Sequence, residues 1–92
     1  MSSSDTWTVL LRKRAQKGVA RAPLADQERL RSAIKGMETD PFAVDVARLS
    51  GEPAAFRRRV GEWRLLFDVH HDVRLVEIRS VERRSTTTYR RR

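Results

Sequence analysis

The sequence predicts an α+β fold in which two N-terminal helices pack on one face of a small antiparallel β-sheet. The spacing of apolar residues is helical between residues 12 and 37 and close to two between residues 55 and 81. Ninety-two residues suffice for one domain, so we expect residues 1–92 to run as strand, helix, helix and then three strands. Residues 1–5 and 90–92 are expected to be flexible ends.

A short apolar strand and two helical stretches occupy the first forty residues. Residues 6–11 are β-branched and apolar, which predicts the strand. Residues 12–21 are basic and are expected to form a first helix, although Gly18 is unfavourable inside one. The clearest helix spans residues 26–37, and its pattern stops at Asp40 because a residue before proline disfavours the helical region. Its apolar stripe consists of Leu30, Ala33, Ile34 and Met37.

Three strand-like runs follow a connecting segment. Residues 42–54 contain a Ser-Gly-Glu-Pro sequence and are expected to form a loop with, at most, a short strand or turn. The three runs are residues 55–60, 62–70 and 73–81. Short turns at residues 61–62 and 71–72 would join them into an antiparallel meander. Because two helices can cover only one face of such a sheet, the other face must meet water or a ligand.

The positive charge of the chain is concentrated in its second part. Twenty basic residues against twelve acidic ones give a formal net charge of +8. Residues 56–92 hold eleven arginines and five acidic residues, whereas residues 1–55 hold nine basic and seven acidic residues. A basic region of this kind attracts a polyanion. The preference for arginine over lysine favours bidentate phosphate contacts, although GC-rich coding DNA also favours arginine.

Alternation along the strands predicts an arginine cluster on the open face of the sheet. Phe56 and Val60 point toward the helices, so Arg57 and Arg59 point away from them. Arg64 alternates with the apolar residues of the next strand and is expected on the same open face. The three guanidinium groups would repel one another unless a phosphate lay among them. A solvated basic face without a ligand is the alternative interpretation.

Other basic and aromatic residues have less defined places. Arg58 falls on the apolar side and is expected at the rim, with its stem packed and its charged head in water. Arg83 and Arg84 follow the last strand, and Tyr89 follows them. The Tyr89 phenol can bind a phosphate, donate a proton or stack on a base, or it is an ordinary tail residue. Arg90 and the two arginines after it are expected to act as an electrostatic tether.

The composition argues against several kinds of site. Cysteine is absent, which excludes disulfides and thiolate metal sites and fits a reducing cytoplasm. The apolar runs are too short for a signal peptide or a membrane span, so we expect a cytoplasmic protein with no membrane partner. The histidines at residues 70–71 are expected at a hairpin tip, away from the arginines. No metal-ligand spacing or Gly-rich loop is visible, and we expect no cofactor.

Several motifs, taken in order, resemble the RelE/ParE superfamily of toxins from type II toxin–antitoxin systems. They are Leu49-Ser-Gly51, the run Phe56-Arg-Arg-Arg-Val-Gly61-Glu-Trp63-Arg64-Leu-Leu-Phe67, and the ending Val76-Glu-Ile78-Arg-Ser-Val81-Glu-Arg83-Arg84 with Tyr89 downstream. The helix that ends at Asp40-Pro41 also fits. The resemblance covers nearly the whole chain and is closer to RelE than to ParE. It implies the same fold of two helices on a small antiparallel sheet.

The resemblance implies a ribosome-dependent endoribonuclease that cuts mRNA in the A site and inhibits translation. In this chemistry the 2′-OH of the RNA attacks the adjacent phosphorus and the 5′-oxygen leaves, which requires alignment and stabilisation of a charged phosphorane. The implied catalytic residues are Arg57, Arg59 and Arg64 on the phosphate, with Arg84 (or Arg83) and Tyr89 at the leaving group. The implied RNA-binding residues are Arg57, Arg59, Arg64, Arg83, Arg84 and Arg90.

The chain departs from the RelE pattern on its second predicted strand, where that pattern has lysines and one of them can act as a base. An arginine does not readily lose its proton. Glu62 lies in a turn and Glu52 in a loop, so neither is clearly placed, and the general base stays unassigned. Two alternatives therefore stay open: a ParE-like inhibitor of DNA gyrase without nuclease activity, and a non-catalytic nucleic-acid-binding module. Either toxin implies a cognate antitoxin that is acidic and partly disordered.

Overall fold

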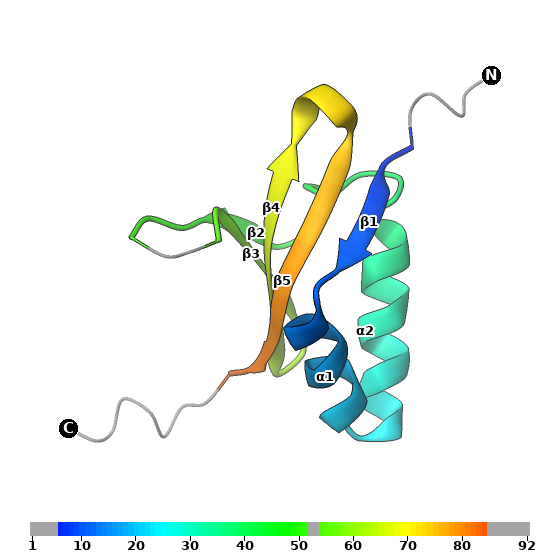
Figure 1. Cartoon of the computed structure of the whole chain (residues 1–92). Coiled ribbons are helices and arrows are strands. Elements are labelled where there is room, and N and C mark those ends of the chain that lie inside the picture. The colour runs from blue at the N-terminus through cyan, green and yellow to red at the C-terminus, as the bar shows by residue number, and fades with distance from the viewer. Residues whose placement is uncertain (1–5, 52–53, 85–92) are drawn as a thin grey trace.

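The computed structural model describes residues 6–51 and 54–84 (Figure 1). Its strands are β1 (Thr8–Leu11), β2 (Val46–Arg48), β3 (Phe56–Val60), β4 (Trp63–His70) and β5 (Leu75–Arg83). Its helices are α1 (Lys13–Arg21), α2 (Leu24–Gly36) and the short 3₁₀ helix η2 (His71–Val73). None of the described helices has the length and apolar character needed to cross a membrane.

The five strands form one sheet in the order β1-β5-β4-β3-β2. β3, β4 and β5 form the predicted antiparallel meander, and β2 pairs antiparallel with β3. β1 pairs with β5 in parallel, so the prediction of an entirely antiparallel sheet is wrong at this edge. The two helices connect β1, at one edge of the sheet, to β2, at the opposite edge. The strands β3, β4 and β5 then follow in order across the sheet, so that β5 lies next to β1 (Figure 1). The direction of β5 relative to β1 depends on this path, which residue periodicity does not encode.

Both helices lie on one side of the sheet, as predicted (Figure 1). The core between helices and sheet consists of Ala15, Val19, Ala22, Leu30, Ala33, Met37, Trp63, Leu65, Phe67, Val76, Ile78 and Val81. The burial of each larger apolar side chain in this set contributes about 1.5–3 kcal/mol. The Trp63 indole Nε1 also donates a hydrogen bond of 3.1 Å to Asp26 Oδ2, which joins β4 to the first turns of α2.

The connecting segments follow the prediction in one place and depart from it in another. The segment 42–54, predicted as a loop with a short strand or turn, contributes the three-residue strand β2, in which Val46 packs against the core. At the tip of the β4–β5 hairpin, Val73 belongs to η2, and Arg74 has a positive φ of 50°. β5 therefore begins only at Leu75, and it continues beyond the predicted range to Arg83.

A β-bulge shifts the alternation of side chains along β5. Leu66 lies opposite Ser80 but Phe67 lies opposite Ile78, so Arg79 is an extra residue on β5. Ile78 is buried in the core before the bulge, and Val81 is buried after it. The core-facing positions thus change from even to odd numbers, because one inserted residue moves every later side chain to the other face. Ser80 and Glu82 consequently face the open side of the sheet.

α1 packs closely against β5 at Gly18. A Cβ atom at this position would overlap the carbonyl oxygen of Val81 and lie 2.9 Å from the Val81 Cβ. A glycine inside a helix costs about 1 kcal/mol relative to alanine. The close contact with β5 gives Gly18 a packing reason that the sequence pattern alone does not supply.

We expect the substitution Gly18→Ala to lower the free energy of unfolding by about 1–3 kcal/mol, because α1 must move away from β5. Gly36→Ala is the matched control, since a Cβ at the end of α2 meets nothing within 4 Å. That control should be neutral or stabilising by up to about 1 kcal/mol. Urea unfolding followed by circular dichroism measures both values. An unchanged or increased stability of the Gly18→Ala protein would contradict the close packing.

Candidate functional site

The open face of the sheet carries Arg57, Arg59 and Arg64, on the side that the alternation predicts. Arg58 shows which side chains of β3 face which side of the sheet. Its Nη1 donates a 3.5 Å hydrogen bond to the backbone oxygen of Ala33 in α2, so Arg58 faces the helices and its neighbours Arg57 and Arg59 face the open side. Arg59 lies directly opposite Arg64 in the register of β3 and β4. The sheet therefore holds the side chains of these two arginines on neighbouring strands at the same level.

Arg58 is less exposed to water than predicted. Its side chain is half-buried, and its Nε atom is buried without a hydrogen-bond partner among the described residues. The prediction that the charged head of Arg58 stays in water is therefore wrong, because the guanidinium lies against α2 and its Nη1 donates to the backbone of that helix.

Arg57 and Arg64 each lie near a carboxylate. Arg57 Nη1 is 3.8 Å from Asp45 Oδ1, and the Arg57 side chain is only 18% exposed. Arg64 Nη2 is 3.9 Å from Glu82 Oε1, and the Arg64 side chain is 44% exposed. Both distances exceed hydrogen-bond length, and a solvent-exposed pair such as Arg64 and Glu82 contributes about 0–1 kcal/mol. The predicted convergence of all three arginines is thus partial: Arg57 leans toward the β2 edge, and Arg64 is more accessible.

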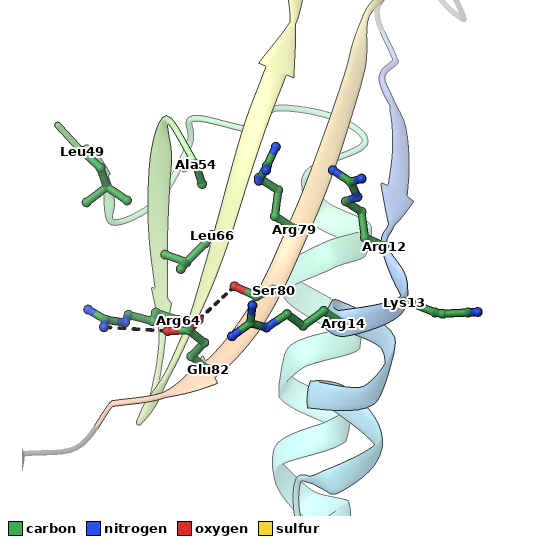
Figure 2. Close-up of a pocket in the computed structure, with 10 residues that line it drawn as sticks. All are labelled: Arg12, Lys13, Arg14, Leu49, Ala54, Arg64, Leu66, Arg79, Ser80 and Glu82. Atoms are coloured by element: carbon green, nitrogen blue, oxygen red, sulfur yellow. Dashed lines mark hydrogen bonds and ion pairs between the residues drawn. The ribbon is translucent and has the colours of Figure 1, made fainter. Parts of the chain in front are cut away.

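A pocket of about 560 Å³ opens on this face between α1, the centre of the sheet and the segment that joins β2 to β3 (Figure 2). Its lining residues are Arg12, Lys13, Arg14, Leu49, Ala54, Arg64, Leu66, Arg79, Ser80 and Glu82. Five of these residues are basic and one is acidic, so the pocket suits an anionic ligand. Arg64 belongs to this lining, whereas Arg57 and Arg59 do not.

Four of the basic lining residues were not predicted as site residues: Arg12, Lys13, Arg14 and Arg79. The Arg79 guanidinium donates a 3.0 Å hydrogen bond to Asp68, and Arg12 lies 3.2 Å from Glu77. Arg14 points from α1 toward Ser80 and Glu82, whereas Lys13 points away from them (Figure 2). The alternation with Ile78 is a signal that places Arg79 on the open face. The basic residues of α1 carry no such signal, because only the tertiary fold brings them to the sheet.

The first turn of α1 has cations where helix electrostatics favours anions. Arg12 is the N-cap residue and makes no side-chain capping bond, and the first turn holds no acidic residue. Lys13 and Arg14 are the first two residues of the helix. Each cation at the positive end of a helix dipole is unfavourable by about 0.3–1 kcal/mol. A bound anion in the adjoining pocket would offset this repulsion.

The two arginines at the end of β5 lie in different surroundings. The Arg83 guanidinium lies over the ring of Trp63, 5.6 Å from its centroid, and 3.8 Å from a Glu62 carboxylate oxygen. Arg84 Nη1 donates a 3.4 Å hydrogen bond to the Gly61 carbonyl oxygen, at the turn between the strands that carry Arg59 and Arg64. Tyr89 and Arg90, also predicted as site residues, lie outside the described residues.

The two histidines occupy the hairpin tip, as predicted. His70 ends β4, and its Nε2 lies 3.1 Å from Glu77 Oε1. His71 begins η2, where its ring packs against the rings of Trp7 and Phe42. Neither histidine lines the pocket. Within residues 6–51 and 54–84, no three His, Cys, Asp or Glu side chains gather as a metal-ligand set.

The chain resembles known toxins in sequence. It is 28% identical over 81 residues to the "Putative toxin RelE1" of Methanocaldococcus jannaschii, and the match covers 85% of this chain and 90% of that protein. No family model matches the chain.

Solved structures share the fold at lower sequence identity. The archaeal RelE–RelB complex from Pyrococcus horikoshii matches with a TM-score of 0.77 and 23% identity, over 88% of this chain and 98% of that chain. The toxin–antitoxin complex RelBE2 from Mycobacterium tuberculosis matches with a TM-score of 0.75 and 22% identity, over 86% and 99%. The isolated E. coli RelE toxin matches with a TM-score of 0.70 and 19% identity, over 91% and 93%. In sequence the chain is thus similar to a protein named as a RelE toxin, and its fold is that of the RelE structures.

Proposed function

We propose that this protein is the toxin of a type II toxin–antitoxin system and that it cleaves mRNA on the ribosome. The observation that carries the proposal is the cationic pocket on the open face of the sheet, which includes Arg64. The likeness to proteins named as RelE toxins supports the toxin part of the proposal. The nuclease part rests on the chemistry of the pocket.

Arg64 is the residue best placed to hold the scissile phosphate. Its side chain is 44% exposed, and its only carboxylate neighbour among the described residues, Glu82, is 3.9 Å away. A phosphate would exchange this loose contact for shorter charge-assisted hydrogen bonds. As the 2′-oxygen attacks, negative charge accumulates on the phosphorane oxygens, and a fixed guanidinium stabilises that charge.

The other arginines would guide the RNA backbone to Arg64. Arg59 is directly opposite Arg64, and Arg57 lies two residues before it on β3. Arg12, Arg14 and Arg79 border the far side of the pocket and would bind neighbouring phosphates. Arg84, with Tyr89 from the following segment, would act at the leaving group.

A cognate antitoxin is the second partner that we propose. The structural neighbours from Pyrococcus horikoshii and Mycobacterium tuberculosis are toxin–antitoxin complexes. With a net charge of +8 on this chain, the partner is expected to be acidic. An acidic segment that lies across the open face would compete directly with RNA.

Expression of the chain in bacteria should stop translation and leave cuts in mRNA at codon-spaced positions. Primer extension on total RNA after induction measures the cuts. Arrest of replication with a DNA-damage response and intact mRNA would instead support inhibition of DNA gyrase. Nucleic-acid binding without growth arrest would leave only a binding module.

Arg64→Ala should reduce mRNA cleavage on purified ribosomes by about 100-fold or more, the size of the loss when one fixed donor to a developing oxyanion is removed. Arg31→Ala is the matched control, because it also removes one exposed positive charge but lies on α2, where its guanidinium contacts Gln27. The control should cleave at close to the parental rate. Equal rates for the two variants would show that general charge, rather than a placed guanidinium, supports cleavage.

A small acidic protein encoded beside this chain should co-purify with it and suppress the growth arrest. Its affinity should fall with increasing salt, because screening weakens contacts between exposed opposite charges. Pull-down at two salt concentrations measures both effects. A complex that does not respond to salt would indicate an apolar interface in place of the cationic face.

A further inference from the structure

The proposed cleavage requires a group that takes the proton of the attacking 2′-OH, and arginine cannot serve because it keeps its own proton. We propose that Glu82 is this general base, an inference that rests on the proposed function. Glu82 is the one acidic residue among those that line the pocket. The Glu82 side chain faces the pocket because the bulge at Arg79 reverses which side chains in the last part of β5 point to the open face.

The position of Glu82 suits a proton acceptor next to a bound phosphate. Glu82 lies directly opposite Arg64 in the register of β5 and β4. Its Oε2 accepts a 3.1 Å hydrogen bond from Ser80 Oγ, which fixes the carboxylate. Its Oε1 is 3.9 Å from Arg64 Nη2, beyond hydrogen-bond distance, and keeps capacity to accept a hydrogen bond. A phosphate held by Arg64 therefore brings its own ribose close to Glu82 Oε1.

Asp68 and Glu77, the other carboxylates of the open-face strands, each have an arginine nitrogen within 3.2 Å. Asp68 accepts hydrogen bonds from the Ala55 N–H at 2.8 Å and from Arg79 at 3.0 Å. Glu77 contacts Arg12 at 3.2 Å and His70 at 3.1 Å. Neither residue lines the pocket. Glu62 lies in the β3–β4 turn with a 74% exposed side chain, away from the pocket lining.

The reaction balances with water as the source and sink of the remaining protons. The 2′-oxygen forms a bond to phosphorus while its proton passes to a carboxylate oxygen of Glu82. The bond from phosphorus to the 5′-oxygen breaks, and that oxygen takes a proton from water. The products are a 2′,3′-cyclic phosphate and a 5′-hydroxyl, and Glu82 returns its proton to solvent. Arg64 stabilises the charge on the phosphorane throughout.

The other charged groups that line the pocket are cations: Arg12, Lys13, Arg14, Arg64 and Arg79. Glu82 also borders a second pocket, between α1 and the end of β5, whose other charged lining residues are Arg14, Lys17, Arg21 and Arg83. A general base acts only in its deprotonated form, so the rate of cleavage by the parent protein should fall in acid.

The test is single-turnover cleavage of mRNA on ribosomes by saturating full-length protein, with the rate measured across pH. Glu82→Gln should slow cleavage by about 10²–10⁴-fold, the range for loss of a positioned general base. It should also lose the acid limb of the pH–rate profile and keep its affinity for RNA. Glu82→Asp should recover part of the rate. Glu28→Gln is the control, because it removes an exposed carboxylate on α2 that does not line the pocket, and it should keep both the rate and the profile.

A second measurement does not depend on the stability of the Gln variant. Added formate should restore cleavage by Glu82→Ala, because a small carboxylate can occupy the vacated space and accept the proton. Circular dichroism reports whether each variant is folded. Absence of rescue in a folded Glu82→Ala protein counts against the proposal.

The outcomes separate this inference from the function on which it rests. If the parent protein cuts mRNA and Glu82→Gln cuts as fast or faster with an unchanged pH profile, Glu82 only restrains Arg64 and the inference is wrong. If the parent protein cuts nothing, or still cuts RNA that carries a 2′-deoxyribose at the scissile position, the proposed function itself fails.

Discussion

Two helices cover one face of the five-stranded sheet, and the functional features of the molecule depend on the face that they leave open. Apolar side chains of β3, β4 and β5 point toward the helices, so the charged side chains that alternate with them, such as Arg57, Arg59 and Arg64, point to the other face. Hydrogen bonds between the strands hold these side chains at fixed spacings. Arg59 and Arg64 are thereby fixed at one level on adjacent strands.

The packing of α1 extends this face beyond the sheet. Gly18 lets the helix approach the backbone of Val81 on β5, which brings the first turn of α1 to the border of the open side. Arg12 and Arg14 line the pocket as a result, although cations at a helix N-terminus are unfavourable for the helix itself. Repulsion among like charges lowers the stability of the folded chain, and an RNA backbone or an acidic partner would relieve it.

Carboxylates on the open face divide its arginines into two groups. Arg12 and Arg79 have partners at 3.2 Å and 3.0 Å, so they are held in defined positions. Arg57 and Arg64 lie 3.8 Å and 3.9 Å from theirs, and such loose contacts cost little to exchange for a phosphate. Arg64 combines a loose partner with access to the pocket, and its partner Glu82 supplies the carboxylate that an arginine-only site would lack.

The sequence by itself determined the two helices, the antiparallel meander and the face on which Arg57, Arg59 and Arg64 lie, because these follow from local periodicity and from the need to bury apolar residues. Only the tertiary structure decided the parallel pairing of β1 with β5 and the place of Arg12 and Arg14 at the pocket. The same holds for Glu82: strict alternation from Ile78 assigns it to the core side, and the bulge at Arg79 moves it to the open side. Contacts between distant segments do not produce a periodic pattern in the sequence, and neither does a single inserted residue in a strand. Their effects are therefore seen only in the folded chain.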